Sequence, residues 1–463
     1  MINNEILREY DIRGIYGSSL TKKDIEVIGK SLSSLMINKG MTDIIIGHDG
    51  RDSSLEIKNL LIDSIRNLGI NVSDISLVPT PVCYFATKKL NIPNSIMITG
   101  SHNPQEYNGF KIIINDEPFY GKQIKNLNNI NIHSNSNIKG SIKYVDILHN
   151  YMDEVLTKIN IKKDLKIVWD IGNGVIGSMF HRLIKKIPGE HLIINSTVDG
   201  NFPNHHPDPT VLKNNIQISN LVKEEGFDLG ISFDGDGDRL GIIDNKGNFV
   251  YSDIILLLIS KFMAIEIKNL TVVADVKCSQ LIFDELRSNN INIIMSKTGH
   301  SLIKKKIQET NAHIAGEMSG HMFFNHNYYG FDDAIFASLK FLEYLSNQKN
   351  TLYNIVNDYL IYSSTPELKL YCKEEVKFKN IEKIVDKIKE NSKDLKINDL
   401  DGVRVEADDY WYLIRASNTQ NCLVFRLECK KNINFKNKFE EIHKFLSDFN
   451  LDLSELNSFY DTI

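Results

Sequence analysis

Two loops of this 463-residue chain carry side chains whose types and spacing could do chemistry. Residues 99–104 read Thr-Gly-Ser-His-Asn-Pro and follow an apolar run, so we expect a strand to deliver the Ser101 hydroxyl to a loop. A serine can carry a transferred group covalently when a neighbouring group moves its proton and stabilises the developing charge. Residues 233–239 read Phe-Asp-Gly-Asp-Gly-Asp-Arg and follow a second apolar run. The first loop alone would be an ordinary polar turn, but the second makes chemistry the better interpretation.

The alternating carboxylates are those of Asp234, Asp236 and Asp238, which can converge on one point in an extended loop. Two unit charges about 4 Å apart repel by roughly 4 kcal/mol at an effective dielectric constant near 20, so the cluster calls for a cation. Oxygen ligands favour a hard ion, Mg²⁺ before Ca²⁺. A calcium-binding EF-hand would need glycine and glutamate where Arg239 and Asn245 stand. An acidic solvated turn would not explain why the loop follows an apolar strand and ends in an anion-binding arginine.

The composition is that of a multidomain globular enzyme. A hydrophobic fraction of 42%, a charged fraction of 24% and a net charge of −5 give no basic surface for nucleic acid. The most apolar stretch, residues 254–259, is far shorter than the roughly 18 residues of a membrane span and predicts a buried helix. The start of the chain lacks signal-peptide features, and the five cysteines form no C-x-x-C pair. We therefore expect a cytoplasmic protein, a monomer or weak dimer, with no membrane or nucleic-acid partner.

A faint internal repeat predicts the architecture. A β-branched run that ends in a polar turn and precedes helix-compatible sequence occurs at residues 43–50, 166–174 and 271–277. Each is followed by a second strand with a polar loop, at residues 99–104, 234–239 and 316–321. The pattern predicts three copies of one α/β unit, with the loops at carboxyl ends of strands, where open α/β sheets bind ligands. The last part differs: a lysine-rich helical stretch near 376–396 precedes strands at 411–414 and 423–427, which flank a loop at Arg415.

Together these motifs resemble the α-D-phosphohexomutases, most closely their bacterial phosphomannomutase/phosphoglucomutase branch. Further segments fall in the family's order, at residues 8–14, 108–112, 199–209, 275–278, 297–303, 316–321 and 415–419. The resemblance implies an α/β fold of three similar mixed-sheet α/β domains plus a smaller C-terminal α+β domain around a central cleft. With the turn signals, it predicts domains at 1–145 with the phosphoserine loop, 146–249 with the metal-binding loop, 250–362 with a sugar-binding loop and 363–463 with a phosphate-binding loop.

The same resemblance implies roles for individual residues. Ser101 would carry a phosphoryl group, and one Mg²⁺ per chain would be held by Ser101, Asp234, Asp236 and Asp238. The catalytic set that it implies is Ser101, Lys111, His102, Arg13 and His300. The substrate-binding set is Tyr10, Arg239, Lys277, His300, Glu317, Ser319, His321, Arg415, Ser417, Asn418 and Thr419. Within these sets Arg415 would clamp the phosphate that is not reacting, Glu317 would bind sugar hydroxyls, and Lys111, before His300, would be the general base.

The implied reaction interconverts the 1-phosphate and 6-phosphate of mannose, glucose or both. Ser101 would give its phosphoryl group to the free sugar hydroxyl, forming a hexose 1,6-bisphosphate that turns end for end and returns its other phosphate. The bisphosphate is also the expected activator. Asn418 favours the hexose enzymes over phosphoglucosamine mutases, the alternative within the class. The named polar contacts do not reach C2 of the sugar, so the choice between mannose and glucose stays open.

Three other classes of protein fit the sequence less well than a phosphohexomutase. Residues 172–177 read Gly-Asn-Gly-Val-Ile-Gly after a strand, the fingerprint of dinucleotide binding, so a Rossmann-type NAD-linked oxidoreductase is the alternative from another class. The next predicted strand ends in Asn195 instead of the acidic residue that would bind a ribose hydroxyl. Thr99 and Asn103 stand where the nucleophile elbow of a serine hydrolase has glycines. A non-catalytic sugar-phosphate or metal-binding protein would have no need of Ser101.

Overall fold

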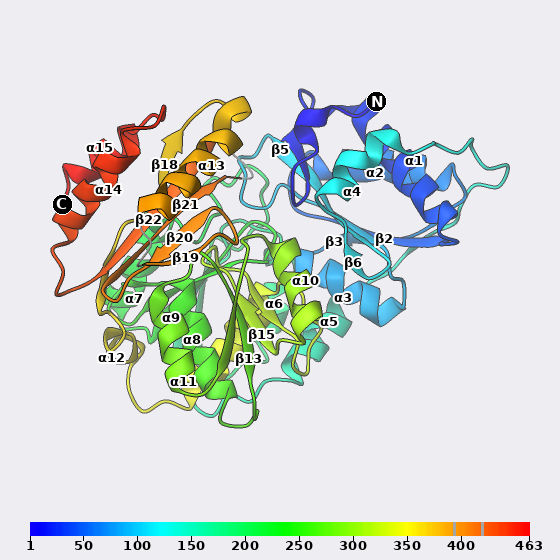
Figure 1. Cartoon of the computed structure of the whole chain (residues 1–463). Helices are drawn as coiled ribbons and strands as arrows, with labels where there is room; N and C mark the ends of the chain where they lie inside the picture. Colours follow the sequence, from blue (N-terminus) through cyan, green and yellow to red (C-terminus); the bar gives the residue numbers. More distant parts are fainter. Residues whose placement is uncertain (392–394, 418–420) are drawn as a thin grey trace.

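The computed structural model describes residues 1–391, 395–417 and 421–463. Its strands form four sheets that follow one another along the chain, with helices packed against them (Figure 1). We call the parts of the chain that carry these sheets the first to fourth domains. This arrangement confirms the predicted fold class, and the exact boundaries near residues 145, 249 and 362 remain a prediction.

The first domain surrounds a mixed sheet. Its strands are β1 (Ile12–Ile15), β2 (Asp43–His48), β3 (Asn71–Leu77), β4 (Ser95–Ile98), β5 (Tyr107–Ile114), β6 (Glu117–Pro118) and β7 (Ile142–Tyr144). Its helices are α1 (Lys22–Asn38), α2 (Ser54–Arg66), α3 (Thr80–Leu90) and α4 (Lys122–Lys125). The strand order is β1-β5-β4-β2-β3-β7, in which β2, β3, β4 and β7 run parallel and β5 runs antiparallel to β4 and β1. The serine loop therefore lies where β4 turns back into an antiparallel neighbour.

The second domain repeats this turn. Its strands are β8 (Leu165–Asp170), β9 (Gly189–Ile194), β10 (Leu229–Phe233), β11 (Leu240–Asp244) and β12 (Phe249–Val250). The helices around them are α5 (Leu148–Leu156), α6 (Gly177–Ile184) and α7 (Ile216–Glu225). Parallel β9, β8 and β10 are followed by antiparallel β11 and β12. The aspartate loop connects β10 to β11, at the place that the serine loop takes in the first domain.

The third domain shows the turn again. Its strands are β13 (Thr271–Asp275), β14 (Asn292–Ser296), β15 (Ile314–Gly316) and β16 (Met322–Phe324). Its helices are α8 (Ser252–Met263), α9 (Gln280–Ser288), α10 (His300–Thr310), α11 (Ala334–Ser346) and α12 (Leu352–Asn357). Parallel β14, β13 and β15 are followed by antiparallel β16, so the loop that carries Glu317 connects β15 to β16. The predicted repeat of one α/β unit is confirmed by these three sheets.

The fourth domain has an antiparallel sheet in the order β17-β22-β21-β20-β19, with β18 on β22. Its elements are β17 (Tyr362–Ser364), β18 (Leu368–Tyr371), α13 (Glu374–Asn391), β19 (Lys396–Asn398), β20 (Val403–Glu406), β21 (Tyr410–Ala416), β22 (Cys422–Lys430), α14 (Phe435–Leu446) and α15 (Ser454–Tyr460). The predicted position of Arg415 in a loop is wrong, because β21 continues to Ala416 and pairs Arg415 with Val424. Both strands are longer than the apolar runs that predicted them.

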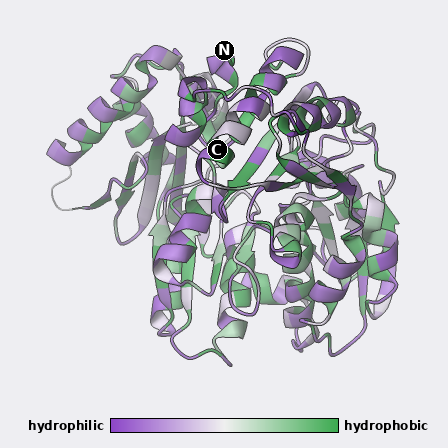
Figure 2. Ribbon diagram, turned by 90° about the vertical axis from the view of Figure 1, so that its right-hand side faces the viewer, coloured by the Kyte–Doolittle hydropathy of each residue, from purple (hydrophilic) through white to green (hydrophobic). Residues whose placement is uncertain are grey.

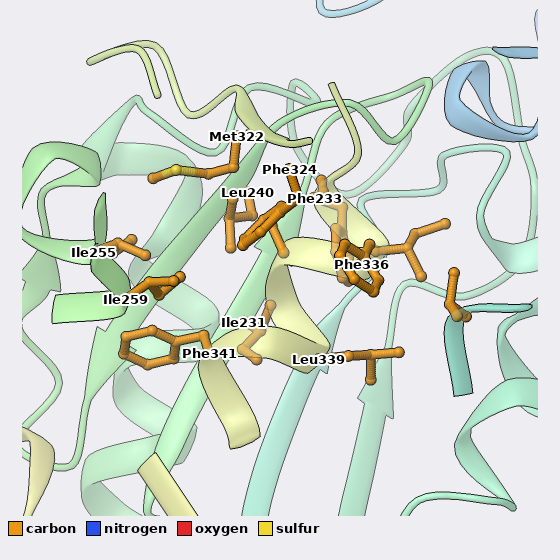
Figure 3. Packing of buried hydrophobic residues seen from close by; sticks show 14 of the residues in the cluster. Ile231, Phe233, Leu240, Ile255, Ile259, Met322, Phe324, Phe336, Leu339 and Phe341 are labelled. Carbon is orange, nitrogen blue, oxygen red and sulfur yellow. The ribbon is translucent and has the colours of Figure 1, made fainter. Parts of the chain in front are cut away.

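A continuous apolar core joins the first three domains. It includes Phe85 of the first, Phe233 of the second and Phe336 of the third. In Figure 3, side chains of α8 and α11 pack against those of β10 and β11. The two strands that flank the aspartate loop are therefore packed against helices of the third domain. The fourth domain has a core of its own.

Hydropathy follows this packing, with hydrophobic residues concentrated on the inner strands and hydrophilic ones on the outer helix faces (Figure 2). The predicted buried helix at 254–259 is confirmed as part of α8. In the described ranges no helix is both long and apolar enough to cross a membrane.

Candidate active site

The serine loop is held in a strained shape by two residues that follow β2. Ser101 is buried and has a left-handed backbone, with φ of 50°, which costs a non-glycine residue free energy unless its surroundings fix it. Asp49 accepts hydrogen bonds from the Thr99 hydroxyl at 2.7 Å and from Gly100 N–H at 3.2 Å. Arg51 donates to the Ser101 carbonyl at 2.7 Å. A Cβ at Gly100 would lie 2.5 Å from the Arg51 guanidinium, so the loop needs glycine there.

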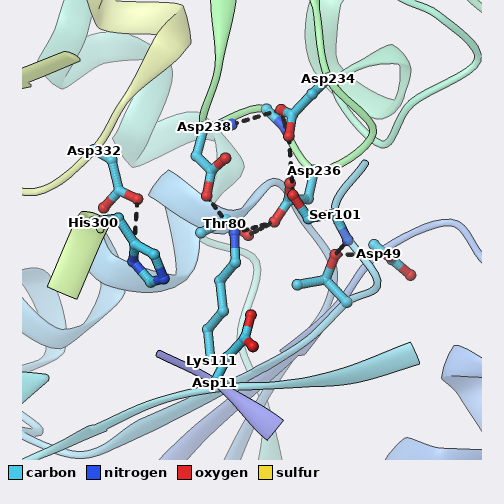
Figure 4. Close-up of polar contacts among 12 residues, drawn as sticks. Asp11, Asp49, Thr80, Ser101, Lys111, Asp234, Asp236, Asp238, His300 and Asp332 are labelled. Atoms are coloured by element: carbon cyan, nitrogen blue, oxygen red, sulfur yellow. Dashed lines mark hydrogen bonds and ion pairs between the residues drawn. The ribbon is translucent and has the colours of Figure 1, made fainter. Parts of the chain in front are cut away.

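The aspartate loop places three fully buried carboxylates together. One oxygen of Asp234 accepts hydrogen bonds from the N–H groups of Gly237, Asp238 and Arg239, at 2.9 to 3.1 Å. The other oxygen accepts a bond from Ser101 Oγ at 3.1 Å (Figure 4). Two residues 133 positions apart in the sequence therefore meet here, as the family resemblance implied.

These carboxylates fit a hard cation. One oxygen from each of Asp234, Asp236 and Asp238 lies within 4.8 Å of the others. Among the residues that the structure describes, Asp236 Oδ1 is buried without a hydrogen-bond donor, and the imidazole of His321 lies 3.2 Å from Asp238 Oδ1. Burial raises the pKa of Asp234 well above its usual value, and the neighbouring carboxylates raise it further. Buried carboxylate oxygen atoms of like charge are the donor set that Mg²⁺ prefers.

Lys111 of β5 supplies positive charge to the same cluster. Its ammonium group lies 2.6 Å from Asp236 Oδ2 and also contacts Asp238 (Figure 4). Burial would lower the pKa of Lys111, but the charges of Asp236 and Asp238 outweigh it and raise that pKa. Lys111 is thus a cation in this arrangement. Thr80, which sequence reasoning missed, donates a second hydrogen bond to Asp236 Oδ2 at 2.5 Å.

Two predicted catalytic residues flank Ser101. His102 Nδ1 lies 3.2 Å from Ser101 Oγ. Burial lowers the pKa of His102 well below its usual value, and the charges of Arg239 and Arg13 lower it further, so the ring is neutral. Arg13 of β1 donates to the side chain of Asn103 at 2.5 Å. His102 therefore lies beside the Ser101 hydroxyl, and Arg13 contacts the same loop two residues further on.

The third domain contacts the aspartate loop through His321. Its Nε2 lies 3.2 Å from Asp238 Oδ1 and its Nδ1 lies 2.9 Å from Glu317 Oε2. Burial and Arg239 would lower the pKa of His321, yet these two carboxylates raise it. Ser319 Oγ lies 3.1 Å from His321 Nδ1. The structure thus brings together the predicted residues Arg239, Glu317, Ser319 and His321.

His300 begins α10 and faces Asp332, another residue that sequence reasoning missed (Figure 4). The distance from His300 Nδ1 to Asp332 Oδ2 is 3.7 Å, and the other Asp332 oxygen accepts a bond from Lys304 at 2.9 Å. Burial lowers the pKa of His300 well below its usual value, and Lys304 and Lys111 lower it further. The ring centroid of His300 lies 5.8 Å from that of His321. A neutral imidazole therefore stands next to the cluster.

The remaining predicted substrate-binding residues lie between the first, third and fourth domains. The Tyr10 hydroxyl donates to the Thr298 carbonyl at 2.7 Å. Asp401 accepts a bond from Thr298 N–H at 3.2 Å and from Arg415 Nε at 3.0 Å. Arg415 Nη2 is buried and lacks an acceptor within the described part of the chain. A buried, unpaired guanidinium nitrogen is suited to an anionic ligand.

Lys277 lies in the turn after β13, where its ammonium group is 3.1 Å from Glu367 Oε1. Ser417 follows β21 and is buried. Asn418 and Thr419 lie outside the described residues, so their predicted contacts stay predictions. Glu367 and Asp401 were not predicted from the sequence, because each stands in a polar stretch with no motif of its own.

The glycine-rich segment at 172–177 forms a tight turn against the aspartate loop. A Cβ at Gly174 would lie 3.0 Å from the carbonyls of Asp234 and Gly235. A Cβ at Gly177 would lie 2.1 Å from the carbonyl of Ser196. These glycines allow close packing of the chain on itself, and their fingerprint is explained without a dinucleotide.

Four family models match the chain in order. They describe phosphoglucomutase/phosphomannomutase α/β/α domain I at residues 4–135, domain II at 143–247, domain III at 251–362 and the C-terminal domain at 367–442. The chain is 40% identical over 424 residues to a phosphomannomutase/phosphoglucomutase of Pseudomonas aeruginosa, with 91% of each chain covered. It is 36% identical to a phosphoglucomutase of Neisseria meningitidis, with 92% of this chain and 93% of the relative covered. A crystal structure of a phosphoglucomutase/phosphomannomutase family protein from Burkholderia thailandensis matches with a TM-score of 0.90 and 34% identity, covering 98% of this chain and 100% of that one.

Proposed function

This chain belongs to the phosphoglucomutase/phosphomannomutase family and is a phosphohexomutase, and we propose that it moves the phosphoryl group through Ser101. As an intramolecular phosphotransferase it acts on hexose phosphates. The NAD-linked oxidoreductase and the phosphoglucosamine mutase are not favoured, because the family matches are to phosphomannomutases and phosphoglucomutases.

The main support for this role of Ser101 is that its Oγ lies 3.1 Å from Asp234 Oδ2. A buried serine in a left-handed conformation is held there by Asp49 and Arg51, not by its own preference. Such a hydroxyl is positioned for in-line attack while its loop excludes water. Thr80 also donates a hydrogen bond to one of these aspartates, but among the described residues only Ser101 combines such a contact with a left-handed backbone.

We propose that Mg²⁺ is held by Asp234, Asp236, Asp238 and an oxygen of the phosphorylated Ser101. When bound, it would neutralise charge on the phosphoryl group during transfer. The described residues add positive charge around the same point, because Lys111 contacts Asp236 and Asp238 and Arg239 directly follows Asp238. Phosphoryl transfer asks mainly for this kind of positioning and charge stabilisation.

In the forward step the free hydroxyl of the sugar attacks the phosphorus, the bond from phosphorus to Ser101 Oγ breaks, and the hydroxyl proton passes to a base. His300 is neutral and therefore able to accept a proton. Lys111 is protonated beside the aspartates, so a role as base would require the negative charge there to be reduced first. We propose that the resulting hexose 1,6-bisphosphate reorients, returns its other phosphate to Ser101, and activates dephosphorylated enzyme.

The far end of the substrate needs a separate clamp. We propose that Arg415 and Lys277 hold the phosphate that is not reacting, with Ser417 beside them. Glu317 and Ser319 would bind sugar hydroxyls. None of these groups distinguishes the two epimers at C2, so mannose and glucose phosphates are both proposed substrates. The cytoplasmic location and the monomeric or weakly dimeric state remain predictions.

The test is the phosphorylation of Ser101 itself. The purified protein should carry phosphate on the peptide that contains residues 100–103, visible by mass spectrometry. Excess hexose monophosphate should remove part of it, and the 1,6-bisphosphate should restore it. Ser101→Ala should lose most turnover but still bind substrate, whereas Ser31→Ala, which removes a buried hydroxyl from α1, should change neither. Near-normal turnover of Ser101→Ala, or label on another residue, would refute the proposal.

A further inference from the structure

Two arginines of the fourth domain bind the turn that carries Lys277. Arg404 of β20 donates from Nη1 to the carbonyls of Val276 and Cys278, at 2.6 and 2.8 Å. Arg426 of β22 donates from Nη1 to the carbonyl of Lys277 at 3.0 Å. Three consecutive carbonyls of one turn are therefore bound by guanidinium groups from another domain. The planar guanidinium group holds its N–H donors in a fixed geometry toward these carbonyls, whereas the donors of a lysine ammonium group rotate freely.

Neighbouring side chains fix both guanidinium groups. Arg404 lies 3.7 Å from the ring centroid of Trp411 and donates from Nε to Glu406 at 3.0 Å. Arg426 donates to Glu428 at 2.5 Å. The second oxygen of Glu428 accepts bonds from the Trp411 indole at 2.6 Å and from the Ser279 hydroxyl at 2.7 Å. Each buried charge is thus paired, and the arginines have little freedom to move.

The sheet register puts these groups on one face. Leu413 of β21 stands opposite Arg404 on one side and Arg426 on the other. Because side chains alternate along a strand, Arg415, two residues after Leu413, projects from the same face. Val276 packs against Leu413 and Trp411. In Figure 1 the strands β20, β21 and β22 lie over the side of the third domain where α9 begins.

We propose that Arg404 and Arg426 are positioning residues for Lys277, and that they make its turn part of the fourth domain. Lys277 and Arg415 are then held as one pair of cations by the same sheet. Glu367, which pairs with Lys277 at 3.1 Å, also comes from the fourth-domain side of the junction. The inference rests on the proposed role of Lys277 and Arg415 in holding the non-reacting phosphate.

The test is a double-mutant cycle on substrate binding. Glucose 1-phosphate is titrated calorimetrically into the full chain in a Ser101→Ala background, so that no turnover occurs. Arg404→Lys keeps the charge but loses the Nε bond to Glu406, the Nη2 bond to Gln280 and the planar stack on Trp411 that hold Nη1 at the two carbonyls. With Lys277 present, it should weaken binding at least fivefold. With Lys277→Met, it should have an effect of less than twofold, because the group that it positions is gone.

Controls separate this role from a loss of stability. Arg66→Lys removes a similar contact, from Arg66 Nε to the Gly140 carbonyl at 2.8 Å in the first domain, and should leave binding unchanged. Reversible unfolding would also weaken the apparent affinity, because only the folded fraction binds the ligand. The thermal stability of every variant is therefore measured, and the titrations are made well below each unfolding transition. Should Arg404→Lys fail to fold, Arg426→Lys gives the same cycle.

Equal effects of Arg404→Lys in the two backgrounds would overturn the positioning role, because the arginine would then act independently of Lys277. Unchanged binding by Lys277→Met alone would instead refute the proposed phosphate clamp. The phosphorylation of Ser101 is tested separately by the mass measurement above, so the two proposals can fail independently.

Discussion

Replacing Lys111 with methionine would remove a charge from the aspartate cluster while keeping most of the side-chain volume. Its ammonium group lies 2.6 Å from Asp236 Oδ2 and also contacts Asp238, and all three side chains are buried. Breaking a buried ion pair by removing one partner costs about 3–5 kcal/mol, because the other charge stays buried without compensation. We expect Lys111→Met to destabilise the metal-free protein by an amount of this order.

The same change should strengthen binding of Mg²⁺, because Lys111 and Mg²⁺ compete to neutralise the same carboxylates. If Mg²⁺ restores half of the stabilisation lost with Lys111, which is about 3–5 kcal/mol, it should bind the variant at least roughly tenfold more tightly. Calorimetric titration of Mg²⁺ in a Ser101→Ala background measures this without a variable amount of phosphoserine. Thermal unfolding with and without Mg²⁺ should show a larger stabilisation in the variant.

Lys58 offers a matched control. It is also buried, and its ammonium group lies 2.8 Å from Asp74 Oδ2 in the first domain. Lys58→Met should lower stability without changing the affinity for Mg²⁺. An unchanged or weaker Mg²⁺ affinity in Lys111→Met would refute the reasoning, because Lys111 would then support the metal site instead of competing for it.

Three further outcomes are expected. Excess chelator should abolish turnover and Mg²⁺ should restore it, since three buried aspartates and a phosphoryl group together carry more negative charge than Lys111 can compensate; full activity in chelator would contradict the assignment of the metal site. Arg415→Ala should weaken binding of hexose monophosphates by roughly ten- to a hundredfold, the equivalent of about 1.5–3 kcal/mol for a charged hydrogen bond, and should release bisphosphate into solution; unchanged binding of both monophosphates would argue against the clamp. Burial raises the pKa of Asp333 from 3.8 to about 7. The folded protein therefore keeps a proton that the unfolded chain releases, so the stability from this group is lost as the pH rises through about 7. The apparent Tm relative to Asp333→Asn should fall from about pH 4 to about pH 7 and then level off, and a constant difference would show that Asp333 is not protonated in the folded state.

The positions of the chemical loops could be predicted because each follows a short apolar run. Strands β4 and β10 end at Ile98 and Phe233, next to the loops that the runs predicted. The resemblance then supplied the pairing of Ser101 with the aspartates, which no local pattern contains. The contact between Ser101 and Asp234 confirms that these loops meet.

Residues that support the loops could not be found in this way. Thr80 begins α3 and Asp332 forms a β-bridge with Phe323 in the third domain, and each contacts a site residue more than 25 positions away in sequence. Their local sequence signals only a helix start or a turn. Arg51 directly follows the predicted strand and turn at 43–50, but its role depends on carbonyls of the serine loop that only the folded chain brings near.

Arg415 shows why a charged residue misleads a strand prediction. A positive residue after the apolar run at 411–414 suggested that the strand had ended. In the structure the strand continues, because Asp401 accepts a hydrogen bond from Arg415 Nε at 3.0 Å and compensates the buried charge. The partner lies on the connection between β19 and β20, which the sequence does not mark.

Glu317 links the proposed sugar-binding loop to the proposed metal site. One of its oxygens accepts a bond from Gly299 N–H at 2.5 Å, and the other pairs with His321, which in turn contacts Asp238. A carboxylate has about four lone-pair positions, so it can still accept bonds from sugar hydroxyls. Removing Glu317 would therefore disturb His321 and the aspartate loop as well as the sugar contact. A loss of activity in Glu317→Ala would not by itself identify a sugar-binding residue, whereas weaker sugar binding with unchanged Mg²⁺ affinity would.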